Sequence, residues 1–350
     1  MDIGNKIRQL RYRSSFTQEQ LADKLSVSAQ AVSKWENGVT MPDIALLPHL
    51  AEVFGISIDE LFDLTVEQKL RRIENRMQVE EDFENDVFRE YREYLLDQLE
   101  KYPEKHKILS LLARLYHHRM EADSKRAAKY AREAILLAPD KKECQWILQK
   151  AQGSQPWDWN VSNHAGIIDF YKSVIEKDTG ENKTSLPYYY LIDNLIADSR
   201  TKEAKEYLDV FRKMKCINPC MTDVYDAMIA LAEHDEKKAD AIMENALLKF
   251  KGEGDILFEA AQYYAKKAEY DKAIEYYEAY YAYEENSKPR FTDPLEAIAM
   301  IYEIRAKYQK AAETYRRILD NLKNEWGMKE ESVVFEMQRK IDEMSGKAIV

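Results

Sequence analysis

The chain has 350 residues, of which 45% are hydrophobic and 33% are charged, and its formal net charge is −11. This length predicts two or three domains, and the apolar content excludes global disorder. With only 10 glycines and 9 prolines, an all-β architecture is excluded too. No apolar run approaches the roughly eighteen residues of a membrane span, and the N-terminus lacks a secretory core. Cys144, Cys216 and Cys220 make no disulfide framework, so we expect free thiols in a cytoplasmic protein.

Two helices are predicted at the start of the chain. Residues 3–13 have apolar side chains on one face of a helix and basic side chains elsewhere. Thr17 and Gln20 have the spacing of a capping box, which begins a second, short helix that runs to about Leu25.

A third helix is predicted over residues 29–37, with Ser28 as its N-cap and Gly38 as its stop. Val32 and Trp35 lie three residues apart and face inward. The remaining side chains of this helix form a small polar outward face: Ala29, Gln30, Ser33 and Lys34. Two short helices joined by a tight turn indicate a helix-turn-helix, whose second helix fits the major groove of DNA.

Two more helices complete this region. Pro42 is expected to begin one of them, and Gly55 to end it. Ser57 is expected to cap a last short helix. Five helices in about sixty residues make a small domain with its own core. We therefore place a DNA-binding domain at residues 1–65.

Residues 3–62 resemble the phage-repressor class of helix-turn-helix domains, the Cro-like or xenobiotic-response-element type. The resemblance is carried by Thr17-Gln18, Leu21-Ala22, Val27, Trp35-Glu36-Asn37-Gly38 and Pro42. It implies that Gln18 touches a phosphate and that Asn37 holds the backbone near one. It also implies that four side chains face base edges: Ser28, Ala29, Gln30 and Lys34. Arg11 and Glu36 are implied to pair inside the domain.

Side-chain chemistry and local charge agree with these roles. A glutamine suits adenine, a lysine suits guanine, and Ala29 offers only a methyl contact. For Arg11 and Glu36 the chemistry favours a pair that holds the fold over a DNA contact. Residues 1–40 carry six basic and four acidic side chains, a net charge of +2, although the whole chain is acidic. A local positive face is sufficient for DNA contact.

Residues 66–83 predict a charged connecting helix. Val66, Leu70, Ile73 and Met77 have the spacing of a two-heptad seam. This seam fits either packing on the next helix or a short dimer contact. Packing is favoured, because two heptads alone are marginal in water.

Residues 84–327 are repetitive. An alanine after a basic residue recurs at Ala127, Ala204, Ala239, Ala273 and Ala311. The last three steps are 35, 34 and 38 residues, and the longer first step predicts a degenerate repeat near 142–177. The pattern resembles tetratricopeptide repeats, strongly at 105–139 and 256–320, and more weakly at 140–250, where the usual glycine is absent. The resemblance implies a right-handed superhelix whose concave face holds peptides or protein partners.

Most of the 23 tyrosines are expected to pack between repeat helices. Asn194 is the predicted backbone-clamping amide of the groove, because an amide both donates and accepts. The candidate groove residues are Asn194, Tyr190, Tyr225, Tyr263 and Arg305. Trp157 and Trp159 interrupt the period, either in a loop that packs back on the solenoid or in an exposed contact surface. Residues 328–350 predict a C-terminal helix with one apolar face, which is an alternative occupant of the groove.

The sequence therefore predicts an all-α protein, with a five-helix phage-repressor-like helix-turn-helix domain followed by a tetratricopeptide-like α-solenoid. It contains no motif for catalysis, a cofactor or a metal, so we expect no enzyme. The same two modules occur in the same order in the cytosolic peptide-pheromone receptors of Gram-positive bacteria, which this chain resembles. That resemblance implies a bacterial transcription regulator that binds a double-stranded DNA operator as a homodimer, with a peptide or protein ligand in the groove. The alternative is a repeat-based interaction scaffold with a vestigial or recruiting DNA-binding head, but the intact reader side chains favour a regulator.

Overall fold

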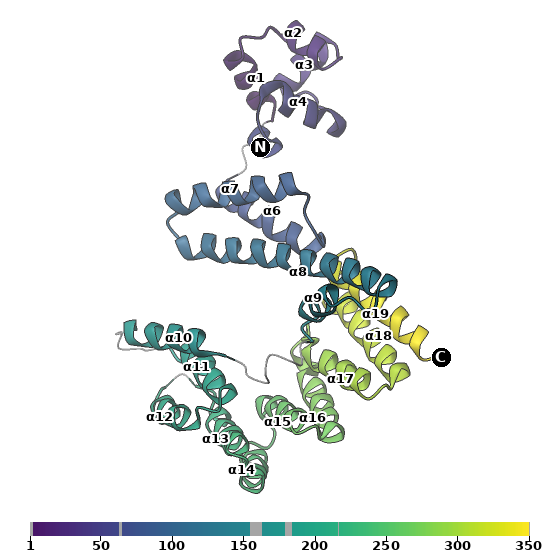
Figure 1. Ribbon diagram of the computed structural model, residues 1–350. Helices are drawn as coiled ribbons and strands as arrows, with labels where there is room; N and C mark the ends of the chain where they lie inside the picture. The colour runs from purple at the N-terminus through teal and green to yellow at the C-terminus, as the bar shows by residue number, and fades with distance from the viewer. Residues whose placement is uncertain (1–2, 63–64, 155–162, 179–183, 216, 350) are drawn as a thin grey trace. The chain divides into compact units, whose positions relative to one another are not determined.

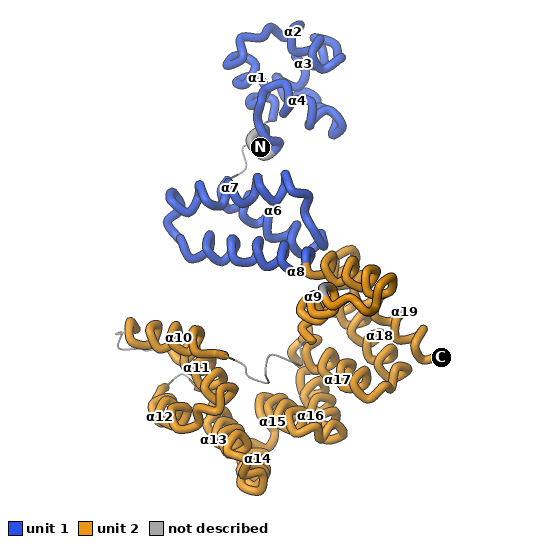
Figure 2. The backbone as a smooth tube through the Cα atoms, in the orientation of Figure 1, with its two compact units in different colours: residues 1–123 blue, residues 124–350 orange. Residues whose placement is uncertain are grey.

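The computed structural model describes residues 3–62, 65–154, 163–178, 184–215 and 217–349, and every regular element in these ranges is a helix (Figure 1). The predicted all-α class is confirmed for this part of the chain. The chain divides into two compact units, residues 1–123 and 124–350 (Figure 2). None of the described helices is long and apolar enough to cross a bilayer. Cys144 and Cys220 are free thiols, whereas Cys216, Trp157 and Trp159 lie outside the described residues.

The first five helices enclose a small apolar core. They are α1 (Ile3–Arg13), α2 (Gln18–Lys24), α3 (Ala29–Glu36), α4 (Leu47–Phe54) and α5 (Ile58–Leu61). Each contributes one fully buried aliphatic side chain: Ile7, Leu21, Val32, Leu50 and Leu61. Burying each of these stabilises the fold by about 1.5–3 kcal/mol. The predicted capping box forms between Thr17 and Gln20, so local sequence signals set the start of α2.

The fourth helix begins later than predicted. Pro42 does not start it, because the side chain of Asp43 accepts a hydrogen bond of 2.9 Å from Ala45 N and opens a 3-10 turn, η1 (Ile44–Leu46). α4 follows with Pro48 in its first turn, where the missing N–H costs nothing. Gly55 ends α4 as predicted, in the left-handed region at φ 64°.

The connecting helix packs within its own chain. α6 (Val66–Val79) lies against α7 (Asn85–Lys101) and the first half of α8 (Lys105–Leu137). Three of its seam residues are buried in this cluster: Leu70, Ile73 and Met77. Buried side chains of α7 and α8, such as Leu95 and Leu115, pack against them. The seam is thus covered by the chain itself, which agrees with the packing interpretation and not with a free dimer seam.

The prediction of a strong repeat at 105–139 is wrong, because α8 is one continuous helix of 33 residues. The segment between Tyr116 and Ala127 contains neither glycine nor proline, but the hairpin turns of the later repeats form without them too, so this absence does not by itself explain the continuous helix. The alanine register also shifts here: Ala128 is buried, whereas Ala127 is half-buried.

Two helices lie where the degenerate repeat is predicted, α9 (Glu143–Ala151) and α10 (Ala165–Lys177). Residues 155–162, between them, are not among the residues that the structure describes. Helical hairpins follow in order. They are α11 (Leu186–Ala197) with α12 (Thr201–Phe211), α13 (Cys220–Ala232) with α14 (Glu236–Lys249), α15 (Gly254–Lys266) with α16 (Tyr270–Tyr283), and α17 (Asp293–Ile304) with α18 (Tyr308–Asn324). A short 3-10 turn, η2 (Glu284–Asn286), follows α16. One apolar core runs through these helices.

The predicted alanine pattern is the packing signature of these hairpins. The alanines of the second helices are fully buried: Ala204, Ala239, Ala273 and Ala311. Five residues before each alanine, the hairpin turn contains a non-glycine residue in the left-handed region. These are Ser199, His234, Ala268 and Ala306, with φ between 52° and 62°. The hairpins at 186–249 therefore form without the usual glycine, whose absence makes the resemblance to tetratricopeptide repeats weaker there. Tertiary packing outweighs a local strain of about 1–2 kcal/mol per turn.

The C-terminal helix covers the last hairpin. α19 (Ser332–Lys347) packs along α18 and buries four apolar side chains, Val334, Met337, Ile341 and Met344. A terminal helix that shields the last repeat from water is a usual feature of repeat proteins.

Candidate nucleic-acid interface and repeat-domain pocket

The recognition helix α3 is held at its start by Ser28. The Ser28 hydroxyl oxygen accepts a hydrogen bond of 3.2 Å from Ala31 N, which makes Ser28 the N-cap. Gln30 and Lys34 are exposed, while Ala29 and Ser33 are half-buried. The opposite face of the helix is fixed in the core, so the exposed side chains have a rigid base.

Arg11 and Glu36 form a buried bidentate pair under this helix. Arg11 Nε lies 2.6 Å from Glu36 Oε1, and Arg11 Nη2 lies 2.9 Å from Oε2. Gln18 Nε2 donates a further hydrogen bond of 2.9 Å to Glu36 Oε2, which joins the start of α2 to the end of α3. Burial alone would raise the pKa of Glu36, but the hydrogen bonds from Arg11 and Gln18 outweigh it and lower that pKa. The group holds the two helices of the motif in place.

Arg8 belongs to the same group, and the sequence did not reveal it. Arg8 Nη2 donates to the backbone oxygen of Glu36 at 2.7 Å and to Asn37 Oδ1 at 2.6 Å. Asn37 is thus fixed just beyond the end of α3, where it remains exposed. The available signal was that Arg8 lies one helical turn before Arg11 and faces the same neighbour.

Asn194, Tyr190 and Arg305 each contact other residues of the repeat domain, and none of the three lines the pocket described below. Asn194 Oδ1 lies 2.7 Å from His164 Nδ1, and Asn194 Nδ2 donates to the backbone oxygen of Tyr190 at 2.7 Å. The Tyr190 ring stacks on another tyrosine, and Arg305 pairs with Asp271. Both ends of the Asn194 amide thus have one partner within the chain, and a backbone clamp at Asn194 stays a prediction.

A pocket of about 350 Å³ lies between α11, α13 and α15. Tyr225 and Tyr263 line it, as two of the predicted groove residues. Asp193 lines it in place of Asn194, since one residue along a helix is a rotation of roughly 100°. The C-terminal helix α19 contributes no side chain to its lining. Glu259 on α15 is the second carboxylate of the pocket, and the sequence did not single it out.

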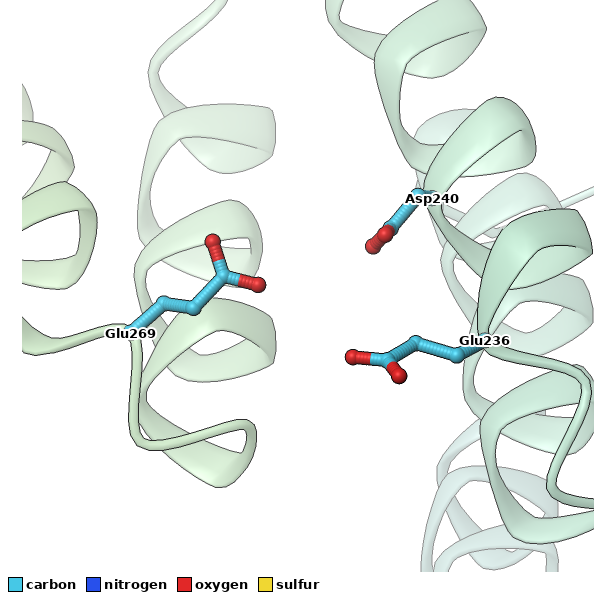
Figure 3. A group of neighbouring side chains, drawn as sticks. All are labelled: Glu236, Asp240 and Glu269. Carbon is cyan, nitrogen blue, oxygen red and sulfur yellow. The ribbon is translucent and has the colours of Figure 1, made fainter.

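A separate group of carboxylates meets between α14 and α16. Glu236, Asp240 and Glu269 face one another with their ligand atoms within 4.8 Å, in a manner that would suit a cation (Figure 3). The ammonium of Lys267 takes this position, at 3.1 Å from Glu236, 2.6 Å from Asp240 and 2.6 Å from Glu269. Burial lowers the pKa of Lys267, but the three hydrogen bonds outweigh that effect and raise it. The chain therefore neutralises this group with its own cation.

The model of one family, Helix-turn-helix, matches residues 7–61. The activator BcrR of Enterococcus faecalis is 41% identical over 76 residues, which are 22% of this chain and 37% of that protein. The competence pilus inhibition repressor of Acinetobacter baylyi is 42% identical over 62 residues, 18% of this chain and 56% of that protein. The chain thus spans about a third to a half of the length of these two relatives.

Two solved structures are similar over most of the chain at low identity. Bacillus thuringiensis PlcR, in complex with a peptide and DNA, is 11% identical with a TM-score of 0.27, over 98% of both chains. The apo form of ComR from Streptococcus vestibularis is 13% identical with a TM-score of 0.24, over 89% of this chain and 98% of that one.

An HTH-type transcriptional regulator of Methanocaldococcus jannaschii is 38% identical over 60 residues, 17% of this chain and 91% of that protein. The three curated relatives are regulators and not enzymes. Their matches cover the segment whose capping box, buried Arg11–Glu36 pair and exposed α3 are described above. The chain belongs to the helix-turn-helix family of DNA-binding transcriptional regulators.

Proposed function

We propose that the protein reads a specific operator in double-stranded DNA through α3. The observation that carries this proposal is the exposure of Gln30 and Lys34 on a helix that is fixed from below by Trp35 and the Arg11–Glu36 pair. A glutamine can form two hydrogen bonds with adenine, and a lysine can donate to the O6 and N7 atoms of guanine. A rigid helix places these two side chains at fixed base positions.

Five neighbouring residues are proposed to complete the interface: Gln18, Ser28, Ala29, Ser33 and Asn37. The Ser28 oxygen accepts the N-cap hydrogen bond, but its hydroxyl proton can still be donated to a phosphate. Gln18 and Asn37 are oriented by Glu36 and Arg8, which supports a role in setting the helix against the DNA backbone.

The repeat region is proposed to provide dimerisation and ligand sensing in a cytoplasmic homodimer. The division is a DNA-binding domain at 1–65, a connecting helix at 66–83, a repeat domain at 84–327 and a C-terminal helix at 328–350. One recognition helix reads too few base pairs for useful specificity, so two half-sites and a dimer are expected. The pocket between α11, α13 and α15 supports a peptide ligand, because it is concave and has both aromatic and charged walls.

Selection of bound DNA from a random pool by the full-length protein tests the proposal. The wild type should enrich two half-sites, and Gln30→Ala or Lys34→Ala should each lose about 1–3 kcal/mol of discrimination at one base position. Lys101→Ala removes an exposed lysine of α7 outside the interface and should keep the wild-type motif. Equal binding of all sequences by the wild type would favour the scaffold alternative.

A further inference from the structure

The pocket between α11, α13 and α15 contains carboxylates that are not balanced by cations. Asp193 lines it from α11 and Glu259 from α15, and Asp255 adds a further negative charge that acts on Glu259. Lys266 lines the same pocket, but among the described residues no ion pair joins its ammonium to Asp193 or Glu259. The pocket therefore has an excess of negative charge.

Both carboxylates are harder to ionise here than in water. Burial, and then the charge of Asp193, raises the pKa of Glu259 to about 7, and the charge of Lys266 offsets only part of this. Although part of Asp193 is exposed, desolvation in the pocket raises its pKa too, against a hydrogen bond from Tyr225 and the charge of Lys266. Like charges in a partly desolvated site destabilise each other, and a bound cation would remove this penalty.

The walls around the carboxylates are aromatic and apolar. The rings of Tyr189 and Tyr225 lie 6.3 Å apart, and Met221 and Met228 of α13 line the same space. The Tyr189 hydroxyl accepts a hydrogen bond of 3.1 Å from Asn218 N, so it is already used within the chain. Ring faces and thioethers beside two carboxylates suit an alkyl stem that ends in a cation.

We propose that this pocket binds a basic side chain of the peptide ligand, with its ammonium or guanidinium group between the carboxylates of Asp193 and Glu259 and its stem along Tyr225. The inference rests on the proposed sensor function of the repeat domain, and it names the chemical class of residue that the sensor recognises.

Binding of such a ligand depends on pH with a defined sign. Glu259 must be ionised, so the affinity should be roughly tenfold higher at about pH 8 than at about pH 6. Asp193, Asp255 and Lys266 are the other charged groups that act on Glu259. Burial raises the pKa of the pocket phenol of Tyr225, so that it stays neutral over this range.

The test uses the full chain and two pools of capped random hexapeptides, one with a fixed lysine and one with norleucine at the same position. Norleucine keeps the alkyl stem and lacks the charge. The affinity of the protein for each pool is measured by competition with a labelled member of the lysine pool. The variants are Asp193→Asn and Glu259→Gln, and Glu206→Gln, an exposed carboxylate of α12, is the matched control.

The wild type and Glu206→Gln should bind the lysine pool roughly tenfold more tightly than the norleucine pool, and Glu259→Gln and Asp193→Asn should lose most of that preference. The variants are isosteric, and thermal unfolding without peptide checks that they fold. Equal binding of both pools by the wild type would overturn this inference and leave peptide sensing intact, whereas binding of neither pool would overturn the sensor function itself. Spermidine that competes as well as the lysine pool would overturn the peptide as the source of the cation.

Discussion

The carboxylates of Glu36 in the helix-turn-helix region and Glu259 in the repeat pocket have opposite environments. Glu36 receives hydrogen bonds from Arg11 and Gln18, and its pKa is lowered. Glu259 has no such partner among its pocket neighbours, and its pKa is raised to about 7. A carboxylate whose hydrogen-bond donors all come from the chain holds neighbouring helices together and is not free to bind a ligand. A carboxylate without such donors can bind a ligand that supplies the missing donor or positive charge.

The three carboxylates around Lys267, those of Glu236, Asp240 and Glu269, are an intermediate case. They converge as they would around a metal ion (Figure 3), but the ammonium of Lys267 lies between them. Convergence of acidic groups is therefore insufficient to indicate a site, and the location of the compensating cation decides the matter.

The largest expected effect comes from breaking the Arg11–Glu36 pair. Arg11→Met leaves the carboxylate of Glu36 buried without its main partner, which should cost about 3–5 kcal/mol. Hydrogen exchange of the backbone amides in α1, α2 and α3 measures this local loss. The double variant with Glu36→Leu should recover most of the protection, because no buried charge remains. Unchanged exchange in the single variant would show that the pair does not hold the motif.

Removal of Lys267 should be the next largest effect. Lys267→Met leaves three carboxylates facing one another, which we expect to cost about 2–4 kcal/mol of unfolding free energy in urea. Millimolar Ca²⁺ should restore part of this loss in the variant and do nothing in the wild type, since calcium prefers carboxylate oxygens. Lys272→Met, which removes an exposed partner of Glu269, is the control and should change stability by no more than about 0.5 kcal/mol.

Glu259→Gln should stabilise the protein at high pH. The pKa of Glu259 is about 7 in the folded chain and near its ordinary value of 4.5 when unfolded, so the folded state binds the proton more tightly. Stability therefore falls as the pH rises from about 4.5 to 7 and stays lower above that range. The variant should gain about 1 kcal/mol at pH 8, after allowance for solvent screening, and nothing at about pH 4.5. A loss of stability at pH 8 would show that Glu259 is compensated within the chain.

The smallest effect concerns left-handed turn residues. The DNA-binding region has both glycines (Gly38, Gly55) and serines (Ser15, Ser26) at such positions, and the turns of the repeat hairpins use non-glycine residues such as Ala306. Ala306→Gly should stabilise the repeats by about 0.5–1 kcal/mol in thermal unfolding, because it relieves the strain of a positive φ. Ala297→Gly, inside α17, should destabilise by about 1 kcal/mol. A destabilised Ala306→Gly variant would mean that the alanine methyl group packs in a way that outweighs the strain.

Sequence reasoning described the DNA-binding region well, because its decisive signals are local. The capping box at Thr17, the N-cap at Ser28 and the stop at Gly55 each depend on residues a few positions apart. Arg8 was missed because its bond to Asn37 joins residues 29 apart, and only the packed helices bring them together.

The repeat region was predicted in outline and not in detail. The buried alanines follow from periodicity, but the direction of a single side chain does not, and the pocket contains Asp193 in place of its neighbour Asn194. The long helix α8 was missed because the repeat spacing predicted a turn before Ala127, and the segment there has the same kind of residues as the turns that do form in the later hairpins.

Lys267 also has a mechanical consequence. Its ammonium joins Glu236 and Asp240 of one hairpin to Glu269 of the next, across the interface on which the stability of a repeat array depends. In such an array the cooperativity of unfolding is set by the coupling between neighbours. When the chain is pulled from its ends, the α13–α14 and α15–α16 hairpins should therefore yield in a single step, and Lys267→Met should split that step in two.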